Sequence, residues 1–158
     1  MRKRIISSSV LEEQVKSTVQ NWLNIEELVE VEVSSEDEAH PIESALLSGS
    51  GSGWRAVDSG EQTIRLVFNH PQSIKSIMLK FEEPGIERTQ EYVLRWSNES
   101  GQPHEIVRQQ WNFSSKGATN EIENHHVELS DVKVLELSIN PDISGGNSIA
   151  TLRELRIA

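Results

Sequence analysis

Six polar and aromatic residues are candidates for a ligand site, because the alternation of the neighbouring segments gives none of them a place in a core. Arginine and glutamine present forked donors and acceptors that suit hydroxyl or carboxylate groups. A tryptophan ring can cover the apolar side of a sugar ring. The residues that combine these properties near predicted strand margins are Trp54, Arg55, Arg88, Gln90, Arg108 and Gln110.

A second interpretation assigns the same residues a structural role. Trp54 would then plug one end of a sandwich, while the arginines pair with nearby glutamates on a solvated sheet face. The two interpretations differ in one geometric consequence. A single site requires Trp54, Arg55, Arg88 and Arg108 to converge on one concave surface.

Catalytic chemistry finds no support in the residue types and their spacing. The chain has no cysteine, which excludes a thiol nucleophile. The run Gly49-Ser-Gly51-Ser-Gly53 has the letters of a hydrolase elbow, but no strand-to-helix setting surrounds it. The carboxylates are too many and too dispersed to nominate a glycosidase pair. We therefore predict that the protein is not an enzyme and uses no cofactor.

Metal binding is not predicted either. His125 and His126 are adjacent, so on a strand they point to opposite faces, and the other histidines lack zinc-site spacing. Segments 58–61 and 140–147 carry oxygen ligands of the kind that calcium prefers, but the same residues are typical of turns.

The elements that must position the candidates are strands with one buried face. Segments 62–68, 76–81 and 91–97 place an apolar side chain at every second position, with turns predicted at 69–71 and 83–85. Further strands are predicted at 29–33, 104–113, 127–129, 135–139 and 152–157. Trp96 and Trp111 fall on the inward faces, so we assign them to the core.

A helix is predicted only near the start of the chain. Ser9 and Glu12 have capping-box spacing, and apolar residues recur at helical intervals from about residue 10 to 23. The run at 48–53 alternates serine and glycine, which predicts flexibility. About eight short strands without alternating helices indicate an all-β antiparallel sandwich.

The order of these features resembles the discoidin, or coagulation factor V/VIII type C, domains. The features that carry this resemblance are a tryptophan loop, the strands Thr63–Phe68, Ile74–Phe81 and Tyr92–Ser97, and the closing segment Leu152–Ile157. The similarity covers about residues 28–158, and residues 97–101 are similar to the family's turn, with Ser100 in place of its aspartate. The terminal cysteine pair of extracellular members is absent, and the helix is additional.

The resemblance implies a galactose-binding-like jelly roll over 28–158 preceded by a helical extension over 1–27. It also implies a non-catalytic binding module whose loops at one end take sugars, phospholipid headgroups or protein partners. Many relatives bind a structural calcium, and intracellular relatives act as scaffolds. We predict a saccharide ligand. The alternative is an intracellular scaffolding or oligomerisation domain whose loops or helix face dock a protein.

Charge and hydropathy restrict the other partners. The formal charge of −10 disfavours unspecific binding to nucleic acid or to acidic lipid. No stretch approaches the ~20 apolar residues of a membrane span. The basic start is followed by serines and acids rather than by an apolar run. We therefore expect a cytoplasmic protein.

Overall fold

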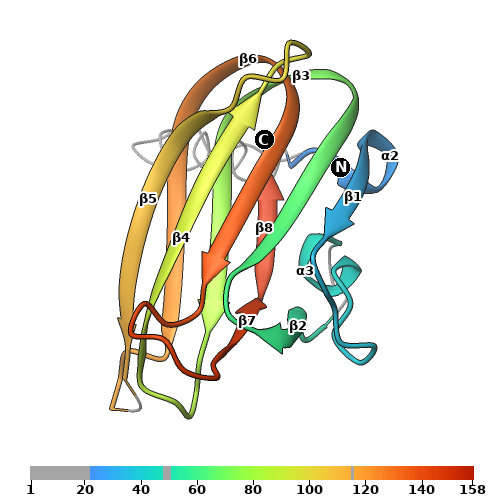
Figure 1. Ribbon diagram of the computed structural model, residues 1–158. Helices are drawn as coiled ribbons and strands as arrows, with labels where there is room; N and C mark the ends of the chain where they lie inside the picture. Colours follow the sequence, from blue (N-terminus) through green and yellow to red (C-terminus); the bar gives the residue numbers. More distant parts are fainter. Residues whose placement is uncertain (1–21, 48–50, 115) are drawn as a thin grey trace, which may run out of the picture.

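The structure is a computed structural model that describes residues 22–47, 51–114 and 116–158 (Figure 1). Within these ranges no helix is long and apolar enough to cross a membrane. The described elements are α2 (Ile25–Leu28), β1 (Val29–Val33), α3 (Glu43–Leu46), β2 (Trp54–Ser59), β3 (Gln62–Glu82), β4 (Arg88–Ser97), β5 (His104–Phe113), β6 (Asn120–Asn140), β7 (Ile149–Leu152) and β8 (Glu154–Ile157).

Two long strands, β3 and β6, build both layers of a sandwich. Each has 21 residues, and the two pair antiparallel with each other along most of their length. The first half of β3 pairs with β1, and its second half pairs with β8. The second half of β6 pairs with β4, which in turn pairs with β5. One layer is therefore β1-β3-β6-β4-β5 and the other is β8-β3-β6, with β2 and β7 as a small separate sheet.

The two layers meet because β3 and β6 arch over at one end of the molecule (Figure 1). The register of the pair shifts between Val67 and Ser76, and Asp131 on β6 adopts a φ of 57°. The opposed layers then touch through side chains. The rings of Phe81 and Tyr92, which lie on strands that do not pair, have centroids 5.3 Å apart. The all-β antiparallel sandwich predicted from the alternation is confirmed.

The prediction that the chain reverses in a turn at 69–71 is wrong. Residues 69–73 lie within β3, where the strand bends but continues, and the predicted strands 127–129 and 135–139 are likewise parts of β6. Polar residues and a proline interrupt the alternation equally at a hairpin and at an irregular bend within a strand. Local sequence therefore could not separate these two outcomes.

The core follows the predicted alternation closely. Strands β3, β4 and β6 bury their inward apolar side chains. Ile64, Leu66, Leu94 and Leu137, for example, are at most 2% exposed. Trp96 and Trp111 are half-buried and pack against this core. The closing segment 152–157 is two short strands separated at Arg153 rather than one.

The predicted helix over 10–23 lies outside the described residues except for Trp22 and Leu23. These two residues are not helical, and the Leu23 N–H donates a hydrogen bond to the Ile157 carbonyl at 2.7 Å. Ile25 is buried in the core cluster. The division of the chain at residue 27 stays a prediction.

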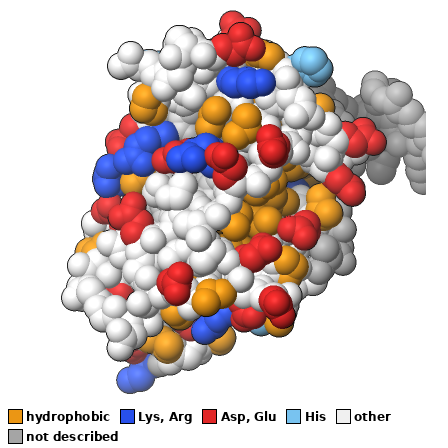
Figure 2. All heavy atoms as spheres, turned by 45° about the vertical axis from the view of Figure 1, so that its right-hand side comes forward, with side chains coloured by type: hydrophobic (Ala, Val, Ile, Leu, Met, Phe, Trp, Pro, Cys, Tyr) orange, Lys and Arg blue, Asp and Glu red, His pale blue; other side chains and the backbone are white. Residues whose placement is uncertain are grey.

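The outward face of the larger layer carries a ladder of charges across four strands. Glu32, Arg65, Glu136 and Arg95 are neighbours in the strand register. Arg65 contacts Glu32 at 3.0 Å and Glu136 at 2.9 Å, while Arg95 lies 3.7 Å from Glu136. Figure 2 shows acidic and basic side chains interspersed over one face of the molecule. Both arginines of this ladder thus pair with glutamates, although the chain carries a net charge of −10.

Gly53 ends the serine-glycine run at a place where the chain has no room for a side chain. Its φ is +85°, and an added Cβ would lie 2.6 Å from the Leu152 carbonyl oxygen. We predict that Gly53→Ala lowers the free energy of unfolding by ~3 kcal/mol, because backbone strain adds to overpacking. Urea denaturation checks this.

Gly85→Ala is the matched control, because nothing lies within 4 Å of its added Cβ. Equal stability of the two variants would show that the approach of Gly53 to β7 is not tight in solution.

Candidate functional site

A pocket of about 260 Å³ lies beside the small β2/β7 sheet, and we call it the β2–β7 pocket. Its wall combines four charged or titratable side chains with two hydroxyl residues and a buried ring. Its principal lining residues are His40, Trp54, Arg55, Glu82, Thr151 and Arg153. Sites for drug-sized ligands measure about 300–1,000 Å³, so this pocket suits one small ring.

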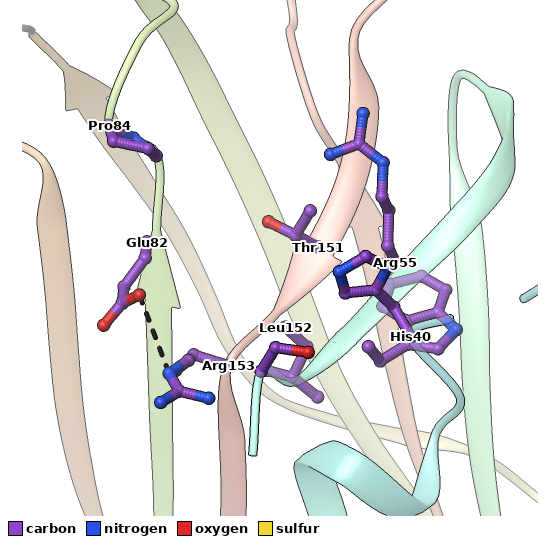
Figure 3. A pocket seen from close by; sticks show the side chains of 9 residues that line it. His40, Arg55, Glu82, Pro84, Thr151, Leu152 and Arg153 are labelled. Carbon is purple, nitrogen blue, oxygen red and sulfur yellow. Dashed lines mark ion pairs between the residues drawn. The ribbon is translucent and has the colours of Figure 1, made fainter. Parts of the chain in front are cut away.

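The pairing of β2 with β7 positions one side of the pocket. Trp54 stands opposite Leu152, and Arg55 stands opposite Thr151. Because successive side chains on a strand alternate, Trp54 turns into the core and Arg55 turns out to the pocket. The Arg55 N–H donates to the His40 carbonyl at 3.1 Å, which brings the 37–40 turn against β2. Figure 3 shows the Arg55 and His40 side chains next to each other.

The end of β3 positions the other side. The Arg153 N–H donates to the Lys80 carbonyl at 2.9 Å, which holds the break between β7 and β8 against β3. Glu82 then lies 3.6 Å from Arg153 and 3.7 Å from Lys80, distances typical of loose, solvated ion pairs. In Figure 3 this pair lies across Thr151 from Arg55 and His40.

Two polar groups of the pocket make no hydrogen bond or ion pair with the described part of the chain. The exposed Arg55 guanidinium is one of them, although its charge acts on the Asp37 carboxylate. The Thr151 hydroxyl is buried and likewise unpartnered in that part of the chain. The donors of Arg55 are therefore available to a ligand with hydroxyl or carboxylate oxygens.

His40 is held in place by its own turn. Its Nδ1 lies 3.3 Å from a carboxylate oxygen of Asp37. The pKa of Asp37 is lowered, first by the hydrogen bond that its carboxylate accepts from the Ala39 N–H and then by His40. Asp37 is thus a carboxylate near neutral pH and keeps the imidazole oriented toward the pocket.

Trp54 forms the floor of the pocket rather than a stacking surface. The residue is 1% exposed, and its indole N–H donates to the Ser35 carbonyl at 3.0 Å. It belongs to the hydrophobic core cluster. Trp54 therefore offers the pocket no exposed aromatic face, and the polar part of the wall is made by charged and hydrogen-bonding side chains.

Arg88 and Gln90 lie between the two layers, away from the β2–β7 pocket. Arg88 is 5% exposed and Gln90 is fully buried. The Arg88 guanidinium contacts Glu83 at 2.9 Å, donates to the Pro141 carbonyl at 2.6 Å, and lies 4.9 Å from the centre of the Phe113 ring. Arg88 thus joins the 83–87 loop to the segment that follows β6.

Arg108 and Gln110 lie on the outward face of the same sheet. Both donate to Glu91, at 2.8 Å and 2.9 Å respectively, and Arg108 also contacts Glu105 at 3.0 Å. The six candidates therefore occupy three settings and do not converge on one concave surface. Only Arg55, with Trp54 beneath it, lies at the β2–β7 pocket.

The structure adds His40, Glu82 and Arg153 to the pocket. One signal for Arg153 was present in the sequence, because two polar residues in succession break the alternation of 152–157. Glu82 is one of 25 acidic residues and His40 lies in a turn, so neither stands out before folding.

The two loops that carry oxygen ligands do meet in space. Glu61, Asn140 and Asp142 line a second pocket of about 230 Å³, and the Gly60 N–H donates to the Ser148 carbonyl at 3.3 Å. The side chains of Asn140 and Asp142 accept hydrogen bonds from nearby backbone N–H groups, as turn residues do. Within the described ranges no group of three or more metal-type ligands is gathered.

The architecture matches solved structures of carbohydrate-binding modules. A pectin-binding module superposes with a TM-score of 0.60 at 20% identity, over 82% of this chain and 89% of its own. A family 32 module from Clostridium perfringens, bound to GalNAc-β-1,3-galactose, gives a TM-score of 0.64 at 15% identity, over 87% and 99%. The chain has the fold of a family 32 carbohydrate-binding module.

The same fold also occurs within larger enzymes. A fucosidase from Ruminococcus gnavus gives a TM-score of 0.69 at 11% identity, over 96% of this chain but only 30% of the enzyme. No protein-family model and no curated protein matches the sequence. At these levels of sequence identity, the similarity shows a shared architecture but does not identify a ligand.

Arg88 is buried and Arg108 is exposed, so we expect the same substitution to affect stability differently at these two positions. Arg88→Met removes one partner of a buried ion pair, so we expect the free energy of unfolding to fall by ~3 kcal/mol. Arg108→Met is the matched control and should leave stability nearly unchanged, since its pairs are exposed. Chemical denaturation measures both, and equal losses would contradict the assignment of Arg88 to the interior.

Proposed function

We propose that the protein is a non-catalytic carbohydrate-binding module that takes a small saccharide in the β2–β7 pocket. The observation that carries this proposal is the convergence of His40, Arg55, Glu82 and Arg153 on a pocket of about 260 Å³. A sugar ring presents hydroxyls in several directions, and these four side chains supply both donors and acceptors.

Arg55 is the principal ligand-binding residue in this proposal. Its guanidinium makes no hydrogen bond or ion pair among the described residues, so binding breaks none there. Glu82 accepts hydrogen bonds from sugar hydroxyls, while its loose contacts with Lys80 and Arg153 orient it. A charged partner makes such a hydrogen bond worth ~1.5–3 kcal/mol.

The comparisons support the ligand class without identifying the sugar. Solved structures with this fold include modules bound to galactose and to 4,5-unsaturated mannuronic acid, at 16% and 18% identity to this chain. Three of the similar structures that match along about nine-tenths or more of their own length are carbohydrate-binding modules. In the described chain, no pair of carboxylates faces the pocket, as Glu82 is its one acid.

The alternative partner, a protein or second copy docked on the apolar face of residues 11–23, stays a prediction. Those residues lie outside the described ranges except for the last two. Nothing in the described surface favours it over the pocket.

The proposal predicts saturable binding of a saccharide that depends on the pocket. We expect calorimetric titration of the full chain with galactose, galacturonate and mannuronate oligosaccharides to show binding of at least one of them. Arg55→Ala and Glu82→Gln should each weaken it by about 10- to 100-fold, as expected for the loss of a charged hydrogen bond.

Arg108→Ala is the matched control, because it removes an exposed arginine that lies outside the pocket. Its affinity should equal that of the unaltered chain. Failure of every saccharide to bind at millimolar concentration, including on a glycan array, would falsify the proposal. Binding that survives both pocket substitutions would move the site elsewhere on the fold.

A further inference from the structure

The polar groups buried between the layers are concentrated around Glu121. Six side-chain atoms in the described chain are buried without a hydrogen-bond partner, and five of them belong to Arg88, Gln90, Trp111 and Glu121. Both carboxylate oxygens of Glu121 are among them, and the residue is 1% exposed. Buried polar groups are otherwise almost always paired, so this concentration requires an explanation.

The cluster belongs to three strands, β4, β5 and β6. Gln90 and Trp111 are neighbours in the β4–β5 register, and Glu121 stands opposite Phe81 on the β3–β6 pair. The Phe81 ring packs on Tyr92, which brings the β6 segment against β4 from the other layer. Glu121 therefore lies in the contact between layers rather than on an outer face.

Within the described ranges, no unpaired cation contacts Glu121. Arg88 is the nearest cation of the described cluster, but its guanidinium already pairs with Glu83 at 2.9 Å. Glu123 lies two residues along β6 and adds a like charge. His125 is partly buried, which lowers its pKa, and its Nε2 lies 2.7 Å from the Tyr92 hydroxyl. Arg88 is thus already paired and burial disfavours the charged form of His125, so the like charge of Glu123 acts on an ionised Glu121 with little to offset it.

A neutral carboxyl fits this environment better than a carboxylate. Burial disfavours the charged form most, the charge of Glu123 adds to this, and Gln90 acts weakly in the opposite direction. Together these influences raise the pKa of Glu121 to about 7. The protonated group has an O–H to donate and lacks the desolvation cost of a charge.

We propose that Glu121 and its neighbours Arg88, Gln90 and Trp111 form an internal proton-binding site that controls how firmly β6 packs on β4 and β5. Protonated Glu121 stabilises the contact between the layers. Ionised Glu121 places an uncompensated charge there and loosens it. Arg88 also holds the 83–87 loop and the Pro141 carbonyl, so the loosened region is the loop-bearing end of the sandwich.

The sign of the pH dependence follows from proton uptake. Glu121 in the unfolded chain titrates near its ordinary pKa of 4.5, well below its value in the folded protein. Between these two values the folded state binds more protons than the unfolded state, so stability falls as the pH rises. The stabilisation by the proton is complete below about pH 4.5 and lost above about pH 7.

Thermal unfolding of the full chain from pH 5 to pH 8.5 at constant ionic strength tests this proposal. We expect the midpoint of the unaltered protein to fall by several degrees over this range. Glu121→Gln keeps a neutral side chain at every pH, so its midpoint should match at pH 5 and exceed that of the unaltered protein at pH 8. Glu128→Gln is the matched control, since it changes an exposed carboxylate of the same strand.

A carbon-detected NMR titration of the side-chain carboxyls keeps the test independent of any variant. A midpoint near pH 7 for Glu121 supports the proposal. A midpoint in the ordinary range for glutamate overturns it, as does a Glu121→Gln midpoint that falls in parallel with Glu128→Gln. None of these outcomes depends on whether a saccharide binds.

Discussion

The bend of β3 and β6 is the constraint on which the rest of this structure depends. Each strand belongs to both layers, so their shared bend sets the distance and angle between the layers. Hydrophobic burial drives the closure, as residues such as Phe68, Ile77 and Phe81 lose their whole exposed surface. β1 and β8 then pair with β3, β4 pairs with β6, and β5 extends the sheet beyond β4.

This construction leaves the interior apolar in the middle and polar toward the loop-bearing end. Arg88, Gln90 and Glu121 replace aliphatic side chains where β4 and β6 approach that end. Buried polar groups stabilise a fold poorly unless they are paired. When they are paired, they can fix the position and register of the strands that carry them, at some cost in stability. Arg88 does so through Glu83 and the Pro141 carbonyl. The loop at 83–87 and the segment after β6 are therefore held in place by a charged side chain in the interior.

Strand identity was readable from local sequence, but strand continuity was not. The alternation at 29–33, 91–97 and 104–113 predicted the observed strands and their buried faces. At 69–73 and near Asp131 the same local signals, polar residues and an interrupted period, accompany a bend instead of a reversal. A bend is decided by which distant strand each half pairs with, and one segment of sequence does not contain that information.

The sequence by itself determined which apolar strand residues face inward, because side-chain direction alternates locally along every strand, but it did not reveal that Arg88 and Gln90 are buried. It determined the β-sandwich class for the same reason. Only the tertiary structure decided the site. The β2–β7 register, the 37–40 turn and the end of β3 bring Arg55, His40 and Glu82 together, although they are far apart in the chain. The tertiary structure also separated Arg88 from Arg108, although both lie on the paired strands β4 and β5. Arg88 lies on the buried face of this sheet and Arg108 on the solvated face.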